Sequence, residues 1–311
     1  MKNLVIIFLV GFVTLSVNGQ NRFNFNQYML NQNTFNPGYL DAYTRFGGTV
    51  IARKQWMTTA SSPLSFQGNG YYQFTKNHGV SGLINQDNIE NFNTIEVSTG
   101  YTYHAWLGKK VALGLGLRIG FEQRGQKNNF VYFNELEPTL NKTSSAAFQM
   151  GTGISLQSQN FDFGFSLPHI FNNTYPNKSM TYKTDYNTFY GHFGYKLRFN
   201  DNFILYPSAL IKGVKGSLPS MSFDGHFLVN QMAWFGGGYR SDNTVSLSAG
   251  ILLDKGLRLI YTYESAIFSP HTRIDVTHEI TVNYARSIAD NPFAKRRYTK
   301  RKGGSFKRKL R

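Results

Sequence analysis

The chain has 311 residues, of which 16% are charged and 16% are aromatic, and it contains 30 glycines and no cysteine. The charged fraction is low against the roughly 25% of ordinary soluble proteins, and the lack of cysteine excludes disulfides and lipoprotein attachment. After the N-terminal segment no run of about 18 apolar residues exists, so helical membrane spans are excluded.

The chain begins with the pattern of a secretory signal. Lys2 supplies a positive charge, residues 4–15 form an apolar run, and Val17-Asn18-Gly19 suits cleavage before Gln20. We therefore predict a signal peptide over residues 1–19. The alternative, an uncleaved anchor, is disfavoured because the apolar run is short for a membrane helix.

Residues 20–44 precede the first predicted strand and are rich in asparagine and aromatic residues, with a turn signal at Asn36-Pro37-Gly38. Two interpretations stay open for this segment. It forms a plug inside the β-barrel predicted to follow, or it is a periplasmic leader without fixed structure.

The middle of the chain alternates between bulky apolar and small or polar residues. In Val111–Phe121 every odd position is bulky and apolar, and every even position is Ala112, a glycine or Arg118. The same alternation recurs in residues 244–251 and 274–284. This period of two predicts β-strands with one apolar face. A soluble sandwich and a membrane barrel both show it.

We count about fourteen such segments from alternation and turn signals. They centre near Thr49, Gly68, Gly82, Ser98, Leu115, Thr152, Phe163, Phe193, Ala209, Asp224, Gly236, Leu247, Ile260 and Ile280. Connections after even-numbered strands are short. The long ones, Arg124–Thr143, Phe171–Asp185 and Ile267–His271, all follow odd-numbered strands. Short periplasmic turns and long external loops are typical of outer-membrane barrels, and a sandwich has no reason to sort its loops.

The predicted fold is therefore an all-β transmembrane outer-membrane barrel of about fourteen antiparallel strands over residues 45–286. Both termini are expected in the periplasm. A barrel of this size has a lumen that must be filled or must conduct, so a diffusion porin or solute transporter is the alternative function. Aromatic girdles at the membrane interfaces are expected at Tyr101, Tyr103, Trp106, Tyr195, Trp234, Tyr261 and Tyr263.

Enzymatic and metal-binding patterns are weak in this sequence. No Gly-x-Ser-x-Gly motif occurs, and the neighbours of His278 point to the opposite face of its strand. Glu279 is expected to pair with Arg118 or Arg240 rather than to act as an acid or base. The histidines show no metal-ligand spacing. We predict no catalytic residue, no cofactor and no metal.

Residues 287–311 form a basic C-terminal tail. Its ten cations are Lys295, Arg296, Arg297, Lys300, Arg301, Lys302, Lys307, Arg308, Lys309 and Arg311. Subtracting them from the formal charge of +16 leaves +6 for the first 290 residues, so the charge is local. Export argues against nucleic acid as the partner. The tail is predicted to bind an acidic periplasmic partner or an anionic envelope polymer, or else to act only as a solubilising tail.

Ordered motifs along the chain carry a family resemblance. They include Asn26-Gln-Tyr-Met29, Phe35-Asn-Pro-Gly-Tyr39, Arg53-Lys-Gln-Trp56, Ser62-Pro63, Asn77-His-Gly79, Pro207-Ser-Ala-Leu210, Gly237-Gly-Tyr-Arg240 and Thr277-His-Glu-Ile280. In this order they resemble the PorP/SprF outer-membrane proteins of the type IX secretion and gliding motility system. The chain departs from that family at residues 36–41 and in the tail, whose role cannot be carried over.

The resemblance implies a non-enzymatic role in protein secretion or cell-surface attachment. Its implied partners are a secreted, adhesin-like cargo protein, bound through its C-terminal domain at the external loops, and periplasmic secretion or motility components below. Composition and spacing alone lead only to an outer-membrane barrel.

Overall fold

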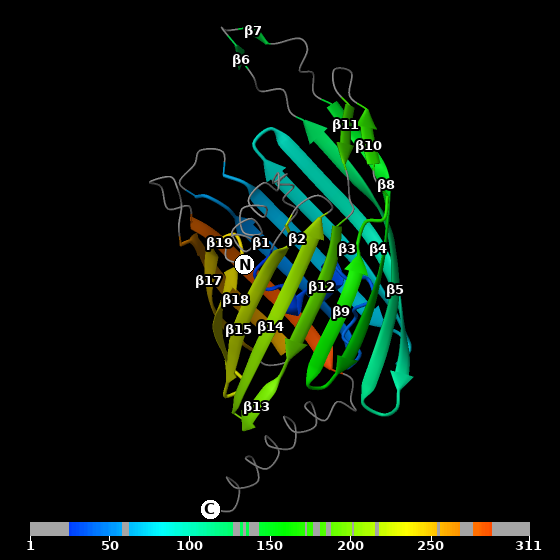
Figure 1. Ribbon diagram of the computed structural model, residues 1–311, viewed down its shortest axis with the longest axis vertical. Coiled ribbons are helices and arrows are strands. Elements are labelled where there is room, and N and C mark those ends of the chain that lie inside the picture. Colours follow the sequence, from blue (N-terminus) through cyan, green and yellow to red (C-terminus); the bar gives the residue numbers. More distant parts are fainter. Residues whose placement is uncertain are drawn as a thin grey trace, which may run out of the picture.

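The computed structural model is a closed β-barrel with a segment of chain inside it (Figure 1). It describes residues 25–57, 62–126, 131–132, 135–136, 143–171, 173–176, 181–184, 188–200, 202–214, 218–253, 256–267 and 276–287. Among these residues, no helix combines the length and the apolar character needed to cross a membrane.

The barrel wall consists of long antiparallel strands in sequence order. They are β1 (Thr44–Lys54), β2 (Leu64–Gln73), β3 (His78–Ile89), β4 (Phe92–Leu107), β5 (Val111–Gln126), β8 (Thr143–Ser158), β9 (Phe161–Leu167), β12 (Thr188–Tyr195), β13 (Leu197–Asn200), β14 (Phe203–Val214), β15 (Ser220–Val229), β16 (Ala233–Arg240), β17 (Thr244–Leu252), β18 (Leu257–Ala266) and β19 (Val276–Ser287). Only Lys196 separates β12 from β13, and both pair with β14, so the wall has fourteen strands.

Two pairings close the sheet into a barrel. β1 pairs with β19, from Thr44 opposite Ser287 to Lys54 opposite His278, and β12 pairs with β14. The predicted strand number is confirmed, and each of the fourteen predicted centres lies in a different strand of the wall. Closure satisfies the backbone hydrogen bonds of the edge strands, which lipid cannot do.

The two faces of the wall differ as the alternation predicts. In β5, Leu115, Leu117, Ile119 and Phe121 are each 44–63% exposed on the outer face, and the even positions between them are buried. Inward positions along the wall are mostly serine, threonine, glutamine, glycine and scattered charges. An apolar exterior around a polar interior is the arrangement of a barrel that is surrounded by membrane lipid.

The two ends of the barrel differ in their connections. At the short-turn end, strands join through tight turns such as the one at Asn230 and Gln231, where both residues have positive φ, as tight hairpins require. At the loop-bearing end lie the connections β5–β8, β9–β12 and β18–β19, and the small hairpins β6 (Val131–Tyr132) with β7 (Glu135–Leu136) and β10 (Asn173–Pro176) with β11 (Thr181–Thr184), seen above the wall in Figure 1. The predicted sorting of loops is confirmed.

Most predicted girdle residues lie on the outer face, but Trp106 and Trp234 do not. Trp106 shares the inward face of β4 with His104 and packs against the Tyr43 ring, with ring centroids 5.8 Å apart. Tyr101, Tyr103, Tyr195, Tyr261 and Tyr263 are 37–45% exposed. The Trp234 side chain is only 7% exposed, faces the lumen and stacks on His226 with ring centroids 5.1 Å apart. Its assignment to a girdle is wrong because its neighbour Phe235 takes the outward position.

The N-terminal segment from Phe25 to Tyr43 runs through the lumen. Its first residues contact Glu279 and Arg240, near the loop-bearing ends of β19 and β16, and Tyr43 reaches the Lys110 carbonyl at the short-turn end. β19 ends at the short-turn end, as expected for a C-terminus facing the periplasm. Residues 1–24 lie outside the described residues, so the predicted side of the N-terminus stays a prediction.

Candidate functional site: the segment that fills the lumen

The lumen segment, residues 25–43, has little regular structure of its own. It contains two single-turn 3₁₀ helices, η1 (Tyr28–Leu30) and η2 (Gln32–Thr34). Yet many of its side chains are almost completely buried, among them Gln27, Leu40 and Ala42 at 0–1% exposure. Because short helices are marginal alone, the wall fixes its conformation.

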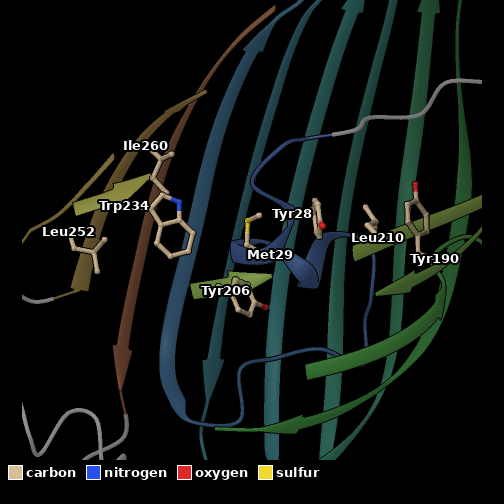
Figure 2. Close-up of a cluster of buried hydrophobic side chains, with 8 residues drawn as sticks. All are labelled: Tyr28, Met29, Tyr190, Tyr206, Leu210, Trp234, Leu252 and Ile260. Atoms are coloured by element: carbon tan, nitrogen blue, oxygen red, sulfur yellow. The ribbon is translucent and has the colours of Figure 1, made fainter. Parts of the chain in front are cut away.

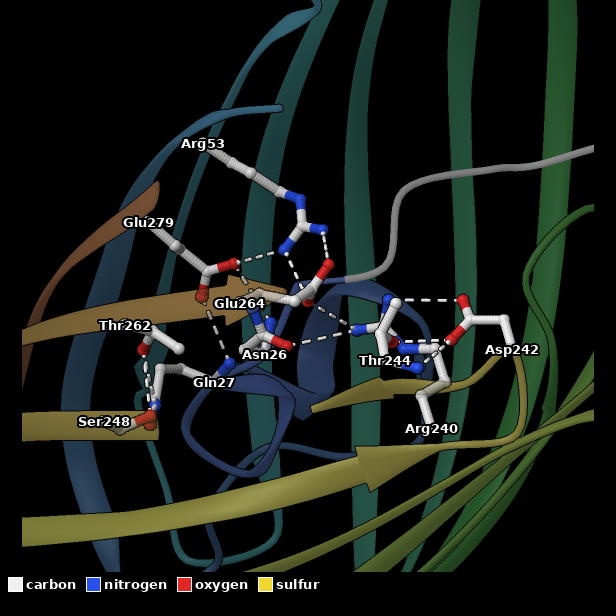
Figure 3. Close-up of polar contacts among 10 residues, drawn as sticks. All are labelled: Asn26, Gln27, Arg53, Arg240, Asp242, Thr244, Ser248, Thr262, Glu264 and Glu279. Carbon is white, nitrogen blue, oxygen red and sulfur yellow. Dashed lines mark hydrogen bonds and ion pairs between the residues drawn. The ribbon is translucent and has the colours of Figure 1, made fainter. Parts of the chain in front are cut away.

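The start of the lumen segment is held by one carboxylate from the last strand. The backbone N–H groups of Asn26 and Gln27 donate to the two Glu279 oxygens at 3.0 and 3.2 Å (Figure 3). The Gln27 side chain donates to Ser248 at 2.8 Å and Thr262 at 3.1 Å. Hydrogen bonds to an ionised, buried acceptor are the stronger kind, so this contact fixes the segment against β17–β19.

Two arginines neutralise the buried acids. Arg53 contacts Glu264 at 2.7 Å and Glu279 at 3.2 Å, and Arg240 contacts Glu264 at 3.3 Å (Figure 3). Arg240 also donates to the Asn26 side-chain oxygen at 3.1 Å. Two arginines and two glutamates balance, as buried charges must. We call these four residues with Asn26 and Gln27 the charged anchor.

The charged anchor corrects one prediction and extends another. Glu279 pairs with Arg53 rather than with Arg118 or Arg240. The motifs at residues 26–29, 53–56, 237–240 and 277–280, which are far apart in sequence, each supply a residue to this one cluster. Glu264 was missed, although an acid at an inward position of an alternating strand is a signal that sequence carries.

An apolar cluster packs beneath the charged anchor (Figure 2). It joins Tyr28 and Met29 of the segment to wall residues Tyr190, Tyr206, Leu210, Trp234, Leu252 and Ile260. The Tyr28 hydroxyl lies 3.1 Å from Ser208 Oγ. The cluster adds hydrophobic burial to the polar attachment.

The middle of the segment is held through both its backbone and its side chains. Arg118 donates to the carbonyls of Asn33 and Thr34, and the Gln32 side chain donates to Asp162 at 2.7 Å. Asn31 bonds the side chains of Gln67 and Asn69 on β2. Arg118 thus binds the lumen segment, which explains why Glu279 finds another partner.

Glycines on β5, β8 and β9 form a floor for the turn at residues 36–38. A Cβ atom added at Gly114 would overlap the Gly38 carbonyl, and one at Gly116 would overlap the Pro37 carbonyl. Gly153 and Gly164 lie in the same way against the Asn36 side chain. We call these four wall residues the glycine floor. The inward glycines of β5 that set the sequence alternation are therefore where another part of the chain lies directly against the strand.

Hydroxyl groups around the glycine floor complete the contact. Thr102 donates to the Pro37 carbonyl at 2.8 Å, Ser155 to the Gly38 carbonyl at 2.7 Å, and Ser166 to the Phe35 carbonyl at 2.7 Å. Asn36 donates to the Ile154 carbonyl at 2.9 Å. The polar groups of the irregular backbone are thereby satisfied inside the barrel, as a non-helical segment at membrane depth requires.

The end of the lumen segment is attached at the short-turn end. The Ala42 N–H donates to the Gln157 side-chain oxygen at 3.0 Å, His104 Nε2 lies 3.1 Å from the Leu40 carbonyl, and the Tyr43 hydroxyl donates to the Lys110 carbonyl at 2.6 Å. The segment is thus held at both ends and in its middle.

Two cavities lie between the segment and the wall among the described residues that line them, and both are small. One of about 60 Å³ is lined by residues that include Phe25, Asn31, Glu96 and His169, and another of about 10 Å³ lies beside Asn26 and Asp224. Sites for small organic molecules measure about 300 Å³ or more, so these spaces suit a few waters or an ion.

One group of possible metal ligands occurs among the described residues. Glu96, Glu122 and His169 place ligand atoms within 4.8 Å of one another near the loop-bearing end. Their sequence spacing gives no motif, because strand pairing and the loop after β9 bring them together. Pairing the inward positions of β4 with those of β5 in the sequence would have identified Glu96 and Glu122 as neighbours.

The tail cations predicted to bind a partner lie outside the described residues. They are Lys295, Arg296, Arg297, Lys300, Arg301, Lys302, Lys307, Arg308, Lys309 and Arg311. Parts of the long loops at residues 127–142 and 177–187 lie outside them as well. The predicted tail and cargo contacts therefore stay predictions.

Solved structures with a similar fold include a channel, a transporter and a FadL homologue. The monoaromatic hydrocarbon channel CymD is 10% identical, covers 86% of this chain and 94% of its own, and has a TM-score of 0.53. The Pseudomonas putida toluene transporter TodX is 8% identical over 88% and 96%, with a TM-score of 0.46. A Pseudomonas aeruginosa FadL homologue is 12% identical over 77% and 88%, with a TM-score of 0.43. At these identities the likeness concerns the fold alone.

Comparison with curated proteins gave no match. The sequence profile of a family described as type IX secretion system membrane protein PorP/SprF matches residues 17–284. That range includes the lumen segment and nearly the whole barrel, and the motifs that meet in the charged anchor fall inside it. The chain is therefore an outer-membrane β-barrel that belongs to the PorP/SprF family of type IX secretion system membrane proteins.

Proposed function

We propose that this barrel is a non-enzymatic platform for secretion or surface attachment of type IX cargo proteins, and that its lumen does not conduct. One observation carries the proposal: the lumen segment is attached to the wall from the loop-bearing end to the short-turn end. A diffusion porin needs a continuous aqueous path. A filled barrel instead offers two rigid faces on opposite sides of the membrane.

The loop-bearing end is the proposed cargo face. Long connections after β5, β9 and β18 gather there, and binding residues often lie on loops held by a rigid scaffold. The partner is a secreted, adhesin-like protein bound through its C-terminal domain. Membership of the family and the sorting of the loops support this assignment.

The basic tail is the proposed contact on the periplasmic side. β19 ends at the short-turn end, and ten cations follow without an intervening acid in residues 291–311. Periplasmic secretion or motility components, or an anionic envelope polymer, would bind this charge. Because exposed charges are screened within about 8–10 Å at physiological ionic strength, that contact weakens with added salt.

A pull-down from detergent-solubilised native outer membranes tests the two faces. Full-length protein is compared with a version ending at Asp290. We expect both to recover a secreted protein, and only the full-length form to recover a periplasmic partner, lost at high salt. If neither form retains a protein partner, the platform proposal fails.

Planar-bilayer recordings test the closed lumen. We expect the full-length barrel to be silent and a variant lacking residues 25–42 to conduct, because about fourteen strands enclose more space than side chains fill. Gel electrophoresis of unheated and heated samples verifies that the variant is folded. A steady, selective current from the full-length protein would instead identify a porin or transporter.

A further inference from the structure

The outer face of the wall carries a basic patch where the first and last strands meet at the short-turn end. Arg45 lies at the start of β1 and Arg286 near the end of β19, and both residues are exposed. Phe46 pairs with Arg286 on one side and with Tyr72 of β2 on the other. We call these four residues the seam patch, because they lie together across the pairing that closes the barrel.

Aromatic rings hold the two guanidinium groups of the seam patch in place. Arg45 Cζ lies 5.8 Å from the centre of the Tyr72 ring, and Arg45 Nη2 donates to the Tyr72 hydroxyl at 3.3 Å. Arg286 Cζ lies 5.9 Å from the centre of the Phe46 ring. Cation–π contacts of this length are attractive. A guanidinium has five N–H donors, so most donors of both groups are left for another acceptor.

No acid balances the seam patch within the part of the chain that the structure describes. Neither arginine makes an ion pair there. Asp41, the acid closest to Arg45 in sequence, accepts hydrogen bonds from the Tyr43 N–H and the Thr44 hydroxyl instead. The patch therefore carries two positive charges that are available to an anionic ligand.

The rim around the seam patch is basic as well. Exposed acids such as Glu90 and Asp242 lie at the opposite, loop-bearing end of the barrel. Cations lie in or beside the short turns: Lys76, Lys109, Lys110, Lys196 and Arg198. Cations at one end of a membrane protein are attracted to anionic headgroups in the leaflet that borders them.

The wall next to the seam patch is apolar. Val50 on β1 and Val282 on β19 are register partners on the outer face, and with Ile280 they are 36–57% exposed. Between them and the arginines, Tyr284 packs on Phe46 with ring centroids 5.8 Å apart. Aromatic residues of this kind mark the level of the headgroups. An acyl chain can lie along the apolar strip while its headgroup reaches the arginines.

We propose that the seam patch binds the phosphate headgroup of an anionic phospholipid, with an acyl chain along the apolar strip beside it. The planar guanidinium matches phosphate through paired N–H donors. Because one arginine belongs to β1 and the other to β19, a headgroup bound by both bridges the two strands that close the wall. The lipid therefore stabilises the closure of the barrel.

Lipid titration of the folded, full-length barrel in detergent, measured by native mass spectrometry, tests the site. We expect phosphatidylglycerol to bind more tightly than phosphatidylcholine, whose phosphate is balanced by its own cation. Arg45→Gln combined with Arg286→Gln should weaken phosphatidylglycerol binding by about 30-fold, the usual contribution of two cations near an anionic lipid surface. The basic tail is the same in both proteins, so the difference isolates the seam patch.

The matched control removes two exposed cations from the same end of the barrel. Lys109→Gln with Lys110→Gln, in the β4–β5 turn, should change phosphatidylglycerol affinity by less than about twofold at physiological ionic strength, because exposed charges are screened within about 8 Å. Gels of unheated and heated samples verify that both double variants are folded.

Two comparisons on the wild-type protein need no variant. Its preference for phosphatidylglycerol over phosphatidylcholine should persist when soluble glycerol phosphate is added, because that ligand lacks the acyl chains. Equal binding of the two lipids, displacement by glycerol phosphate, or an equal loss in the two double variants would each overturn the proposal.

Discussion

The lumen segment is held by two walls that work in different ways. On the side of β1 and β16–β19, the charged anchor holds it through long side chains and ion pairs. On the side of β5, β8 and β9, the glycine floor holds it by close backbone contact and short hydroxyl hydrogen bonds. The first contact depends on charge balance and the second on the absence of side chains.

This difference teaches how each wall would fail. Removing one partner of a buried ion pair leaves the other charged and desolvated, which is more costly than never having placed the pair there. Adding a methyl group to the glycine floor creates overlap with backbone that cannot rotate away. Charge deletion should therefore damage one wall and volume addition the other.

The largest effect is expected at Glu264. Glu264→Ala leaves Arg53 and Arg240 short of a buried partner, and the unfolding free energy should fall by about 3–5 kcal/mol. Urea titration in lipid vesicles measures it. Asp242→Asn is the control, because Asp242 also contacts Arg240, at 3.8 Å, but is 50% exposed, and exposed pairs contribute about 0–1 kcal/mol. Equal effects would contradict the role of burial.

The next effect is expected at Gly116. Gly116→Val places two methyl groups against the Pro37 carbonyl and should destabilise the barrel by about 2–3 kcal/mol or displace the lumen segment. Gly82→Val is the control, because a Cβ there meets no atom within 4 Å. Loss of the faster- or slower-migrating band of the unheated sample on a gel would report destabilisation. A new conductance in planar bilayers would report displacement of the lumen segment. A tolerated valine at Gly116 would show that the glycine floor is not a close contact.

A smaller effect is expected at Gln27. Gln27→Ala removes the hydrogen bonds to Ser248 and Thr262, but those two hydroxyls already bond each other at 3.0 Å. The wall therefore stays satisfied, and the loss should be about 1–2 kcal/mol. Urea titration in lipid vesicles measures this loss of unfolding free energy. A loss as large as that of Glu264→Ala would mean that neutral contacts dominate the charged anchor.

The smallest effect is expected at Tyr28. Tyr28→Phe keeps the ring in the apolar cluster and removes one hydrogen bond to Ser208, which costs about 0.5–1.5 kcal/mol. Tyr72→Phe on the outer face, where the hydroxyl contacts Arg45 at 3.3 Å, should be close to neutral. The same urea titration measures the loss of unfolding free energy in both variants. A larger loss for Tyr72→Phe than for Tyr28→Phe would contradict the prediction.

The wall was predictable because its signal is local. Lipid on one side and the lumen on the other force a period of two along each strand, so residues 111–121 already reveal which face β5 turns outward. Loop lengths then separated the two ends. Neither inference depends on which two strands pair to close the barrel.

Contacts that depend on closure were not predictable. Arg53 and Glu279 are direct register partners only because β1 meets β19, and nothing near either residue announces that. Trp234 and Phe235 are adjacent aromatics, so one must face inward, and composition does not say which. The path of residues 25–43 is set by contacts with many strands at once, and the turn signal at Asn36 gave only one point on it.

The hydrogen bonds from Asn26 and Gln27 to Glu279 span more than 250 residues of chain. The strand that closes the wall also supplies the carboxylate that holds the first part of the lumen segment. Assembly that waits on such distant partners is slow, because loop-closure entropy is lost before the contacts form. A chain interrupted before its final strand would lose closure and attachment together, so a half-assembled barrel has no stable filled state in which to persist.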